Sequence, residues 1–215
     1  MAEPDDPVGR IILSDACVAE GAEWLARAEP RFAEALARTG PLPLRRNPDG
    51  FGQLLSAIVS QQVSVASARA IRARLEDAGM TSQAAIAHVD EDHLRSLGLS
   101  RQKARYAKAL AGAGIDFDAL RTAPTPEVVR TLTEVKGIGV WTAEIFAMFS
   151  LGRADVFAPG DLALQEGARV LFDLPERPKE RALREMAEAW SPWRSVAARA
   201  LWAYYHVAKN REGIA

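Results

Sequence analysis

The chain is poor in the residues on which several common protein classes depend. It has one cysteine, Cys17, and three histidines among 215 residues. A single cysteine excludes an intramolecular disulfide framework and any four-cysteine zinc or iron–sulfur site. No apolar run approaches the roughly 18 residues of a membrane span, and the acidic N-terminus does not read as a signal peptide. We therefore expect a cytoplasmic protein with no membrane partner, no iron–sulfur cluster and no required cofactor, and its excess of arginine over lysine hints at a bacterial coding sequence.

A strong net charge is also missing. Lysine and arginine total 27 and aspartate and glutamate total 28, which gives a formal charge of −1. Any nucleic-acid-binding surface must therefore be a local basic patch that acidic residues offset elsewhere. No segment alternates apolar and polar residues with a period of two, whereas helical spacing recurs, for example from Phe51 to Val63. The sequence predicts an all-α protein of about ten helices.

A glycine-punctuated turn joins two predicted helices in the second half of the chain. Gly137 and Gly139 flank Ile138, and a helix is expected to open at about Val140. Glycine allows the backbone to approach another molecule closely, and a helix N-terminus attracts anions. The turn therefore predicts an anion site suited to a DNA phosphate, with an ordinary connection between helices as the alternative.

One carboxylate, that of Asp161, follows the turn and directly precedes a predicted helix. Asp161 comes directly after Pro159-Gly160 and directly before an apolar helical run that begins at Leu162. An aspartate in this position is a good helix N-cap, and the helix dipole stabilises its charge. Capping and catalysis are compatible roles for the same side chain, so both remain open for Asp161.

Two motifs together resemble those of a known family. Val135 to Ala143 fits the hairpin of the helix-hairpin-helix (HhH-GPD) base excision DNA glycosylases, and Asp155-Val156-Phe157 with Asp161 fits the signature that follows it there. The resemblance is greatest to the 3-methyladenine DNA glycosylase II branch and extends from about Phe51 to Ala208. A Gly-Ile-Gly alone would be weak, but the two motifs at this separation are a strong signal.

The resemblance implies an HhH-GPD fold in which two helical lobes flank a cleft that holds DNA and the active site. We expect residues 1–48 to form N-terminal helices and a linker that pack on the second lobe. Residues 49–130 are expected to form a helical lobe with a DNA wedge. Residues 131–215 are expected to carry the helix-hairpin-helix and the catalytic aspartate.

The resemblance also implies a base pocket. Trp141 stands where strand-cleaving relatives carry a lysine that forms a Schiff base, so no amine nucleophile is expected there. An aromatic face instead suits a cationic alkylated base, with a core position under the hairpin as the alternative. Trp193 is expected to line the pocket opposite Trp141, and Ile145 and Leu162 are expected to make it aliphatic. The remaining aromatic residues of the last helices, Trp190, Trp202 and Tyr205, fit the core better.

The DNA-contacting residues follow from the same motifs. Gln62, beside Gln61, matches the side chain that fills the gap left by a flipped nucleotide, although a solvated helix junction is the alternative. The residues expected to bind a DNA phosphate are Lys136, Gly137, Ile138, Gly139 and Thr142. Backbone carbonyls near Val135 and Ile138 could also hold an optional sodium or potassium ion.

A basic stretch precedes the hairpin. From His93 to Ala111 the chain has no acidic residue and carries Arg95, Arg101, Lys103, Arg105 and Lys108. A solvated helix face and a phosphate-facing flank beside the hairpin are both open.

The implied activity is monofunctional excision of alkylated bases, of the 3-methyladenine and 7-methylguanine type, from double-stranded DNA by a monomer. Asp161 would stabilise positive charge on the deoxyribose, and Asp155 would pin the loop. Two alternatives stay open: a glycosylase of the same superfamily for another lesion, and a non-enzymatic hairpin module that only holds DNA.

Overall fold

The computed structural model describes residues 8–211 and divides the chain into two compact units, which we describe separately. Unit 1 is Met1–Arg46 with Ala147–Ala215, and unit 2 is Asn47–Phe146. The boundary falls inside helix α10, Val140–Phe149, rather than near residue 130 where the sequence suggested it. The hairpin therefore belongs to unit 2 and Asp161 to unit 1.

The described residues are helical, as predicted. They form thirteen α-helices, more than the expected ten, and the one β element among residues 8–211 is an isolated bridge between Ile11 and Arg153. No helix within that range is long and apolar enough to cross a membrane.

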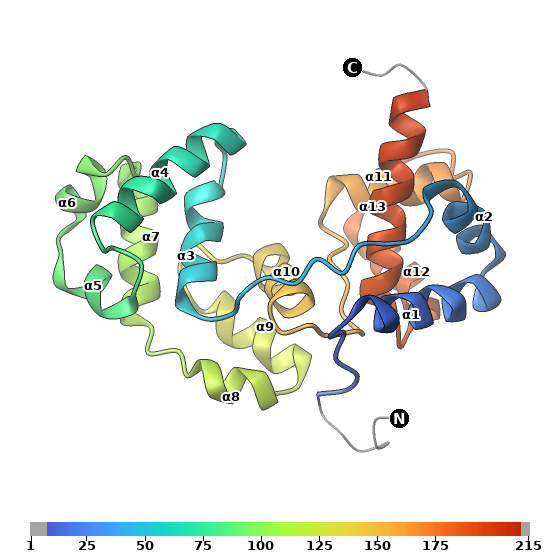
Figure 1. Ribbon diagram of the computed structural model, residues 1–215, viewed down its shortest axis with the longest axis horizontal. Coiled ribbons are helices and arrows are strands. Elements are labelled where there is room, and N and C mark those ends of the chain that lie inside the picture. The colour runs from blue at the N-terminus through green and yellow to red at the C-terminus, as the bar shows by residue number, and fades with distance from the viewer. Residues whose placement is uncertain (1–7, 212–215) are drawn as a thin grey trace. The chain divides into compact units, whose positions relative to one another are not determined.

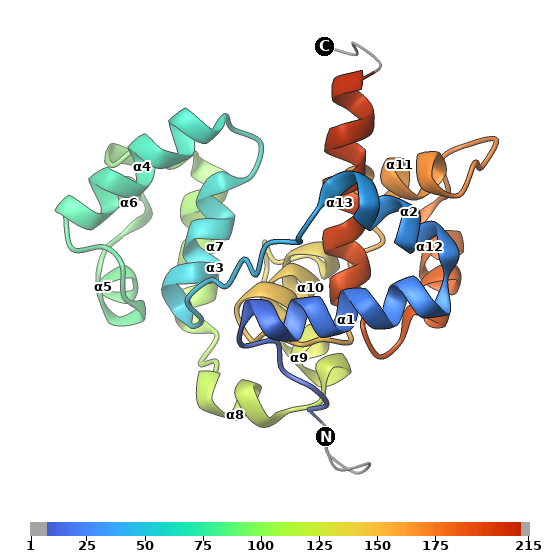
Figure 2. The ribbon, with the colours of Figure 1, turned by 45° about the vertical axis from the view of Figure 1, so that its right-hand side comes forward.

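Unit 1 is built around the last helix. Figures 1 and 2 both show α13 with α1, α2 and α11 packed beside it. Its helices are α1 (Asp15–Ala28), α2 (Pro30–Thr39), α11 (Leu162–Leu171), α12 (Glu180–Ala187), the 3-10 helix η1 (Glu188–Trp190) and α13 (Arg194–Arg211). The N-terminal helices thus pack on the part of the chain that carries Asp161.

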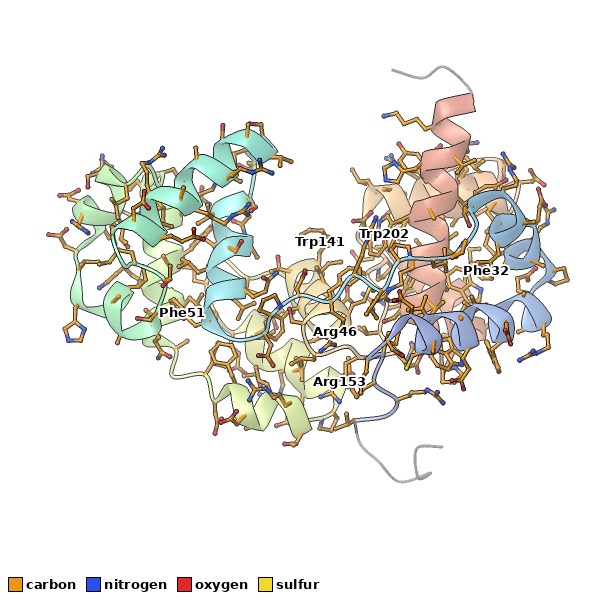
Figure 3. All side chains as sticks on the ribbon, viewed as in Figure 1. Phe32, Arg46, Phe51, Trp141, Arg153 and Trp202 are labelled. Carbon is orange, nitrogen blue, oxygen red and sulfur yellow. The ribbon has the colours of Figure 1, made fainter. Side chains whose placement is uncertain are left out.

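Two glycines allow the close crossings on α13. A Cβ added at Gly21 of α1 would lie 2.6 Å from Cε3 of Trp193, and one at Gly167 of α11 would lie 2.7 Å from the Leu201 carbonyl oxygen. Behind them, Phe32, Phe157 and Phe172 surround Trp190 with ring centroids 5.3–5.8 Å from it. Edge-to-face and stacked pairs of this kind stabilise a core beyond the area they bury (Figure 3 labels Phe32).

Unit 2 is built around α7, which packs against α3, α5 and α6, and α4 packs against α3. Its helices are α3 (Phe51–Ser60), α4 (Val65–Asp77), α5 (Gln83–His88), α6 (Glu91–Ser96), α7 (Arg101–Gly112), α8 (Phe117–Thr122), α9 (Thr125–Thr133) and most of α10. The helices α3 and α7 are in contact, and Leu54 and Ile58 of α3 and Ala104 and Ala107 of α7 are fully buried. Small residues on α7 let the two helices pack closely, and α9 and α10 then present the hairpin.

Candidate functional site

The turn between α9 and α10 forms the predicted hairpin. Val135 and Ile138 are 6% and 4% exposed and fix the turn to the core, and the Ile138 N–H donates to the Val135 carbonyl at 3.0 Å. Gly137 has φ of +100°, and a Cβ there would lie 2.3 Å from Cγ of Tyr106. Only glycine satisfies both the backbone angle and the space at this position.

Gly139 serves a different purpose. A Cβ added there would have no neighbour within 4 Å, and the residue is exposed. The Ala143 N–H donates to the Gly139 carbonyl at 3.0 Å, so the amide groups of Gly139 and Val140 lie at the N-terminal end of α10. The absence of a side chain leaves this helix end open, so the geometry allows the anion site, which stays a prediction.

The predicted phosphate-binding residues do not all face the same way. Lys136 is exposed and Gly137 is half-buried, whereas Ile138 can contribute only its backbone because its side chain is buried. Thr142 is 8% exposed and lines a cavity between α3 and α10. Thr142 can therefore contribute to the phosphate-binding surface only through its backbone N–H, because its side chain, in the first turn of α10, points inward.

The wedge segment connects α3 to α4 beside the hairpin. The Gln61 side-chain amide donates to the Gly137 carbonyl at 2.9 Å and so ties the segment to the turn. Gln62 is exposed and has φ of +52°, a conformation that costs a non-glycine residue about 1 kcal/mol. Gln61 thus anchors the segment while the Gln62 side chain is exposed, and the wedge role of Gln62 stays a prediction. Val63, Gly139 and Tyr106 join both glutamines in lining a groove of about 560 Å³.

A smaller cavity, of about 160 Å³, lies between α3 and α10. Trp141 and Ile145 line it, together with Leu54, Phe146 and the side chain of Gln61. Trp141 is 46% exposed, so it is not the core tryptophan that was the alternative (Figure 3). Two of the four predicted base-pocket residues, Trp141 and Ile145, therefore meet in unit 2.

Asp161, in unit 1, caps α11. Its Oδ1 accepts hydrogen bonds from the N–H groups of Ala163 at 2.9 Å and Leu164 at 3.0 Å. The indole Nε1–H of Trp202 donates to the same oxygen at 3.2 Å. The side chain is half-exposed, and its neighbour Leu162 is 61% exposed, so the carboxylate is neither sealed in the core nor loosely held.

The loop before Asp161 is fixed to α13 and α11 at several points. Asp155 accepts from Nε of Arg194 at 2.6 Å and from Oγ of Ser191 at 2.9 Å, which supports its structural role. The Ser195 hydroxyl donates to the Val156 carbonyl at 3.1 Å, and the Gln165 side-chain amide donates to the Pro159 carbonyl at 2.8 Å. Such a loop holds its carboxylate in one place before any substrate arrives, which is what electrostatic stabilisation requires.

The structure corrects the roles of two tryptophans. Trp193 is 4% exposed, with its ring against Gly21 and under the guanidinium of Arg10 at 4.8 Å, so it belongs to the core of unit 1. Trp202, expected in the core, is half-exposed and bonded to Asp161. A signal was present: Trp193, Val196, Ala197, Ala200, Leu201 and Tyr204 form one helical stripe that leaves Trp202 off it.

A buried cation lies behind Trp202. Phe149 and Trp202 have ring centroids 5.7 Å apart, and the guanidinium of Arg199 lies 4.8 Å from the Phe149 centroid. Burial lowers the pKa of Arg199 to about 10, and repulsion from Arg45 and Arg46 adds to this effect. Arg199 donates to the carbonyls of Leu44 and Ser195, both at 2.9 Å, so its hydrogen bonds tie the linker before unit 2 to α13.

The hairpin carbonyls fit the optional cation in one respect. The Val135 carbonyl accepts one hydrogen bond, from Ile138, and an oxygen of this kind has a second lone pair. The Gly137 carbonyl is engaged by Gln61. No group of three or more histidine, cysteine, aspartate or glutamate side chains is placed to hold a metal ion within residues 8–211.

Comparisons with known proteins agree on one family. A family model described as "HhH-GPD superfamily base excision DNA repair protein" matches residues 55–192. DNA-3-methyladenine glycosylase 1 of Schizosaccharomyces pombe is 32% identical over 181 residues, which are 80% of this chain and 79% of that protein. A crystal structure of DNA-3-methyladenine glycosidase from Bacillus halodurans has a TM-score of 0.79 and 34% identity and covers 89% of this chain and 91% of its own. A 3-methyladenine DNA glycosylase from S. pombe, solved in complex with abasic DNA, has a TM-score of 0.72 and 27% identity and covers 85% and 95%.

Proposed function

Because this chain belongs to the HhH-GPD superfamily of base excision DNA repair proteins, we propose that it is a DNA glycosylase for alkylated bases. It hydrolyses the N-glycosidic bond of bases of the 3-methyladenine and 7-methylguanine type in duplex DNA and leaves an abasic site. The relatives that are 3-methyladenine glycosylases, one of them solved with abasic DNA, support this substrate class.

The observation that carries the proposal is the held carboxylate of Asp161. Two backbone amides and the Trp202 indole donate to Oδ1 and fix its position. Breaking the glycosidic bond builds positive charge on the deoxyribose, and a fixed negative charge stabilises that transition state more than the neutral ground state. The same carboxylate can orient or deprotonate the attacking water.

The other residues of the site suit a base that leaves without protonation by an acid. A base alkylated on a ring nitrogen is cationic and departs readily, so one carboxylate is enough. Trp141, 46% exposed on α10, offers a ring face that attracts a cation. It offers no amine for a Schiff base with the sugar, so the DNA strand stays intact after base release.

The hairpin supplies the grip on DNA. Gly139 and Val140 present backbone amides at the N-terminus of α10, Lys136 adds a positive charge, and Gln62 projects beside them as the wedge. An optional monovalent cation at the carbonyls near Val135 and Ile138 remains part of the proposal. Since one chain carries both the hairpin and Asp161, we propose that it acts as a monomer.

Base release from defined duplexes tests the proposal. Duplex DNA carrying alkylated purines is incubated with the protein, and free base, abasic sites and strand breaks before alkali are measured separately. We expect free alkylated base, abasic sites and unbroken strands. Binding without release of any base would instead identify a DNA-holding hairpin module. Release only from oxidised or mismatched duplexes would identify a glycosylase of the superfamily for another lesion.

A further inference from the structure

Unit 2 has a second open pocket next to the hairpin, and apart from Lys136 none of its lining residues has a role assigned above. It has a volume of about 400 Å³, and its lining is polar or charged apart from one aromatic ring. We call it the basic pocket; its residues are Arg101, Gln102, Arg105, Tyr106 and Lys136. Arg101, Gln102 and Arg105 come from the first two turns of α7, and Lys136 comes from the hairpin turn.

The structure separates these cations from the other basic residues of the same stretch. Lys103 is buried and its amine donates to the Val59 carbonyl at 2.7 Å, and burial lowers the pKa of that amine. Lys108 donates to three carbonyls at the end of α5. Arg95 pairs with Asp92 at 2.6 Å. Lys103 and Lys108 therefore serve the fold and are not available to a ligand, and the charge of Arg95, which is not among the pocket residues, is offset by Asp92.

The cations that line the basic pocket are available to a ligand. Arg101 and Lys136 are exposed, and within the described residues neither has an ion-pair partner. Arg105 is also exposed, and Nε of its guanidinium lies 3.5 Å from Oε2 of Glu91, the one acidic side chain paired with the pocket. Three positive groups thus face one negative group, and the surplus favours an anion.

The basic pocket adjoins the groove of about 560 Å³ beside the hairpin, which Gln61, Gln62, Val63, Tyr106 and Gly139 line and which we call the hairpin groove. Gln102 and Tyr106 line both, and the Tyr106 ring lies directly under Gly137. Lys136 is the residue that precedes Gly137, so the two anion-attracting surfaces meet at the turn. A polymer with regularly spaced charges can occupy both surfaces at once, whereas a single small anion occupies one.

We propose that the basic pocket binds a second phosphate of the DNA strand whose backbone the hairpin holds. This inference rests on the proposed function, because it takes DNA as the ligand. Arg101 and Arg105 contact the phosphate through their guanidinium groups, which present paired donors to phosphate oxygens, and Lys136 adds a point charge. Glu91 weakens the contact by competing for Arg105. The pocket strengthens binding to any duplex, since phosphates carry no sequence or lesion information.

The test is the salt dependence of binding to undamaged duplex DNA. Fluorescence anisotropy gives the dissociation constant of the wild-type protein, of Arg101→Gln/Arg105→Gln and of Lys136→Gln across about 50 to 200 mM salt. We expect the double variant to bind about tenfold more weakly at the lower salt, and the slope of log affinity against log salt to become shallower by about one. We expect Lys136→Gln to lower the affinity and the salt slope as well, but by less. This variant tests the pocket without altering α7.

Two further variants give opposite expectations. Glu91→Gln removes the competing carboxylate, so its affinity for duplex DNA rises above that of the wild type. Arg95→Gln removes one positive charge from α6 outside the pocket, so its affinity and salt slope stay at the wild-type values. If Arg101 and Arg105 had a purely structural role, the double variant would keep the wild-type salt slope and Glu91→Gln would not raise the affinity for duplex DNA.

The outcomes separate this inference from the proposed function. Wild-type salt slopes in both pocket variants, or an equal loss of affinity in Arg95→Gln, overturn the second phosphate site even if alkylated bases are released normally. Tighter binding of inorganic phosphate than of duplex DNA at the same charge concentration also overturns it, because the pocket is then a small-anion site. A wild-type protein that binds DNA with the predicted slopes but releases no base contradicts the proposed function alone.

Discussion

The two units hold their functional groups by different physical means. Unit 2 presents backbone amides at the end of α10, exposed cations and a projecting glutamine, and most of these groups have few protein contacts. Unit 1 presents one carboxylate whose Oδ1 accepts three hydrogen bonds, on a loop that four further side chains fix. A protein makes many contacts with a phosphate backbone, and each one is weak. A charge that stabilises a transition state must instead be held accurately in one position.

This contrast has a consequence for mutagenesis. Substitutions on the unit 2 surface should weaken DNA binding in small steps that add up. Substitutions around Asp161 should change the rate of base release far more than the affinity for DNA. The following predictions test that division, beginning with the largest effect.

Asp161→Asn removes the negative charge and keeps the helix cap, because asparagine caps helices about as well as aspartate. We expect the single-turnover rate of base release to fall by about 10²–10³-fold, with the affinity for DNA and the melting temperature close to wild type. Asp155→Asn, six positions earlier, is the matched control: it weakens the pairing with Arg194 and lowers the melting temperature more than the rate. A comparable loss of rate in both variants would contradict the assignment of Asp161.

Gly137→Ala and Gly139→Ala should differ in kind. At Gly137 a Cβ would lie 2.3 Å from the Tyr106 ring and φ is +100°, so we expect a loss of about 2–4 kcal/mol in the free energy of unfolding. At Gly139 the space is empty, so stability should hold while the added methyl group keeps a phosphate away and DNA affinity drops several-fold. Urea unfolding measures the stability of both variants, and fluorescence anisotropy measures their affinity for DNA. Equal stability of the two would show that Tyr106 moves aside.

Trp202→Phe keeps an aromatic ring and removes the Nε1–H that donates to Asp161. A hydrogen bond to a charged group contributes about 1.5–3 kcal/mol, and two backbone donors remain, so we expect the rate of release to fall by about tenfold. The melting temperature should change little because the side chain is half-exposed. Trp193→Phe gives the reverse pattern, with a lower melting temperature and a smaller effect on rate. A rate unchanged by Trp202→Phe would reduce Trp202 to a packing residue.

Gln62→Ala and Gln62→Gly separate the wedge from its backbone. Both remove the projecting side chain, so base release from duplex DNA should fall several-fold, and less from single-stranded DNA where no gap has to be filled. Only Gln62→Gly also relieves the positive φ, so it should raise the free energy of unfolding by up to about 1 kcal/mol. Equal losses on single- and double-stranded substrates would remove the wedge role.

The sequence carried local signals for much of this molecule. Helical periodicity predicted the all-α class, the glycines with Val135 and Ile138 predicted the hairpin, and an aspartate before an apolar run predicted the cap at Asp161. Each of these rests on a few neighbouring residues. The exposed Trp141 also followed from a motif that lies within one turn of helix.

Features that depend on how helices rotate against one another were missed. Whether Trp193 or Trp202 faces Asp161 depends on how closely α1 approaches α13 at Gly21. Lys103 and Lys108 have the same charge as Arg101, and only the positions of α3 and α5 show that their amines bind carbonyls. The boundary between the units could not be predicted either, because α10 is regular across it and a regular helix gives no break in its pattern.

Because Asp161 caps a helix, a variant at this position can keep its fold in the cell even when it loses its carboxylate. If Asp161 acts as we propose, asparagine at this position would remove the activity while leaving the folding intact, so quality control would have no unfolded chain to remove. The inactive protein would accumulate at its normal level and occupy damaged sites through its unaltered hairpin. On the proposed mechanism, replacing one carboxylate oxygen by an amide nitrogen thus turns a repair protein into one that blocks damaged sites.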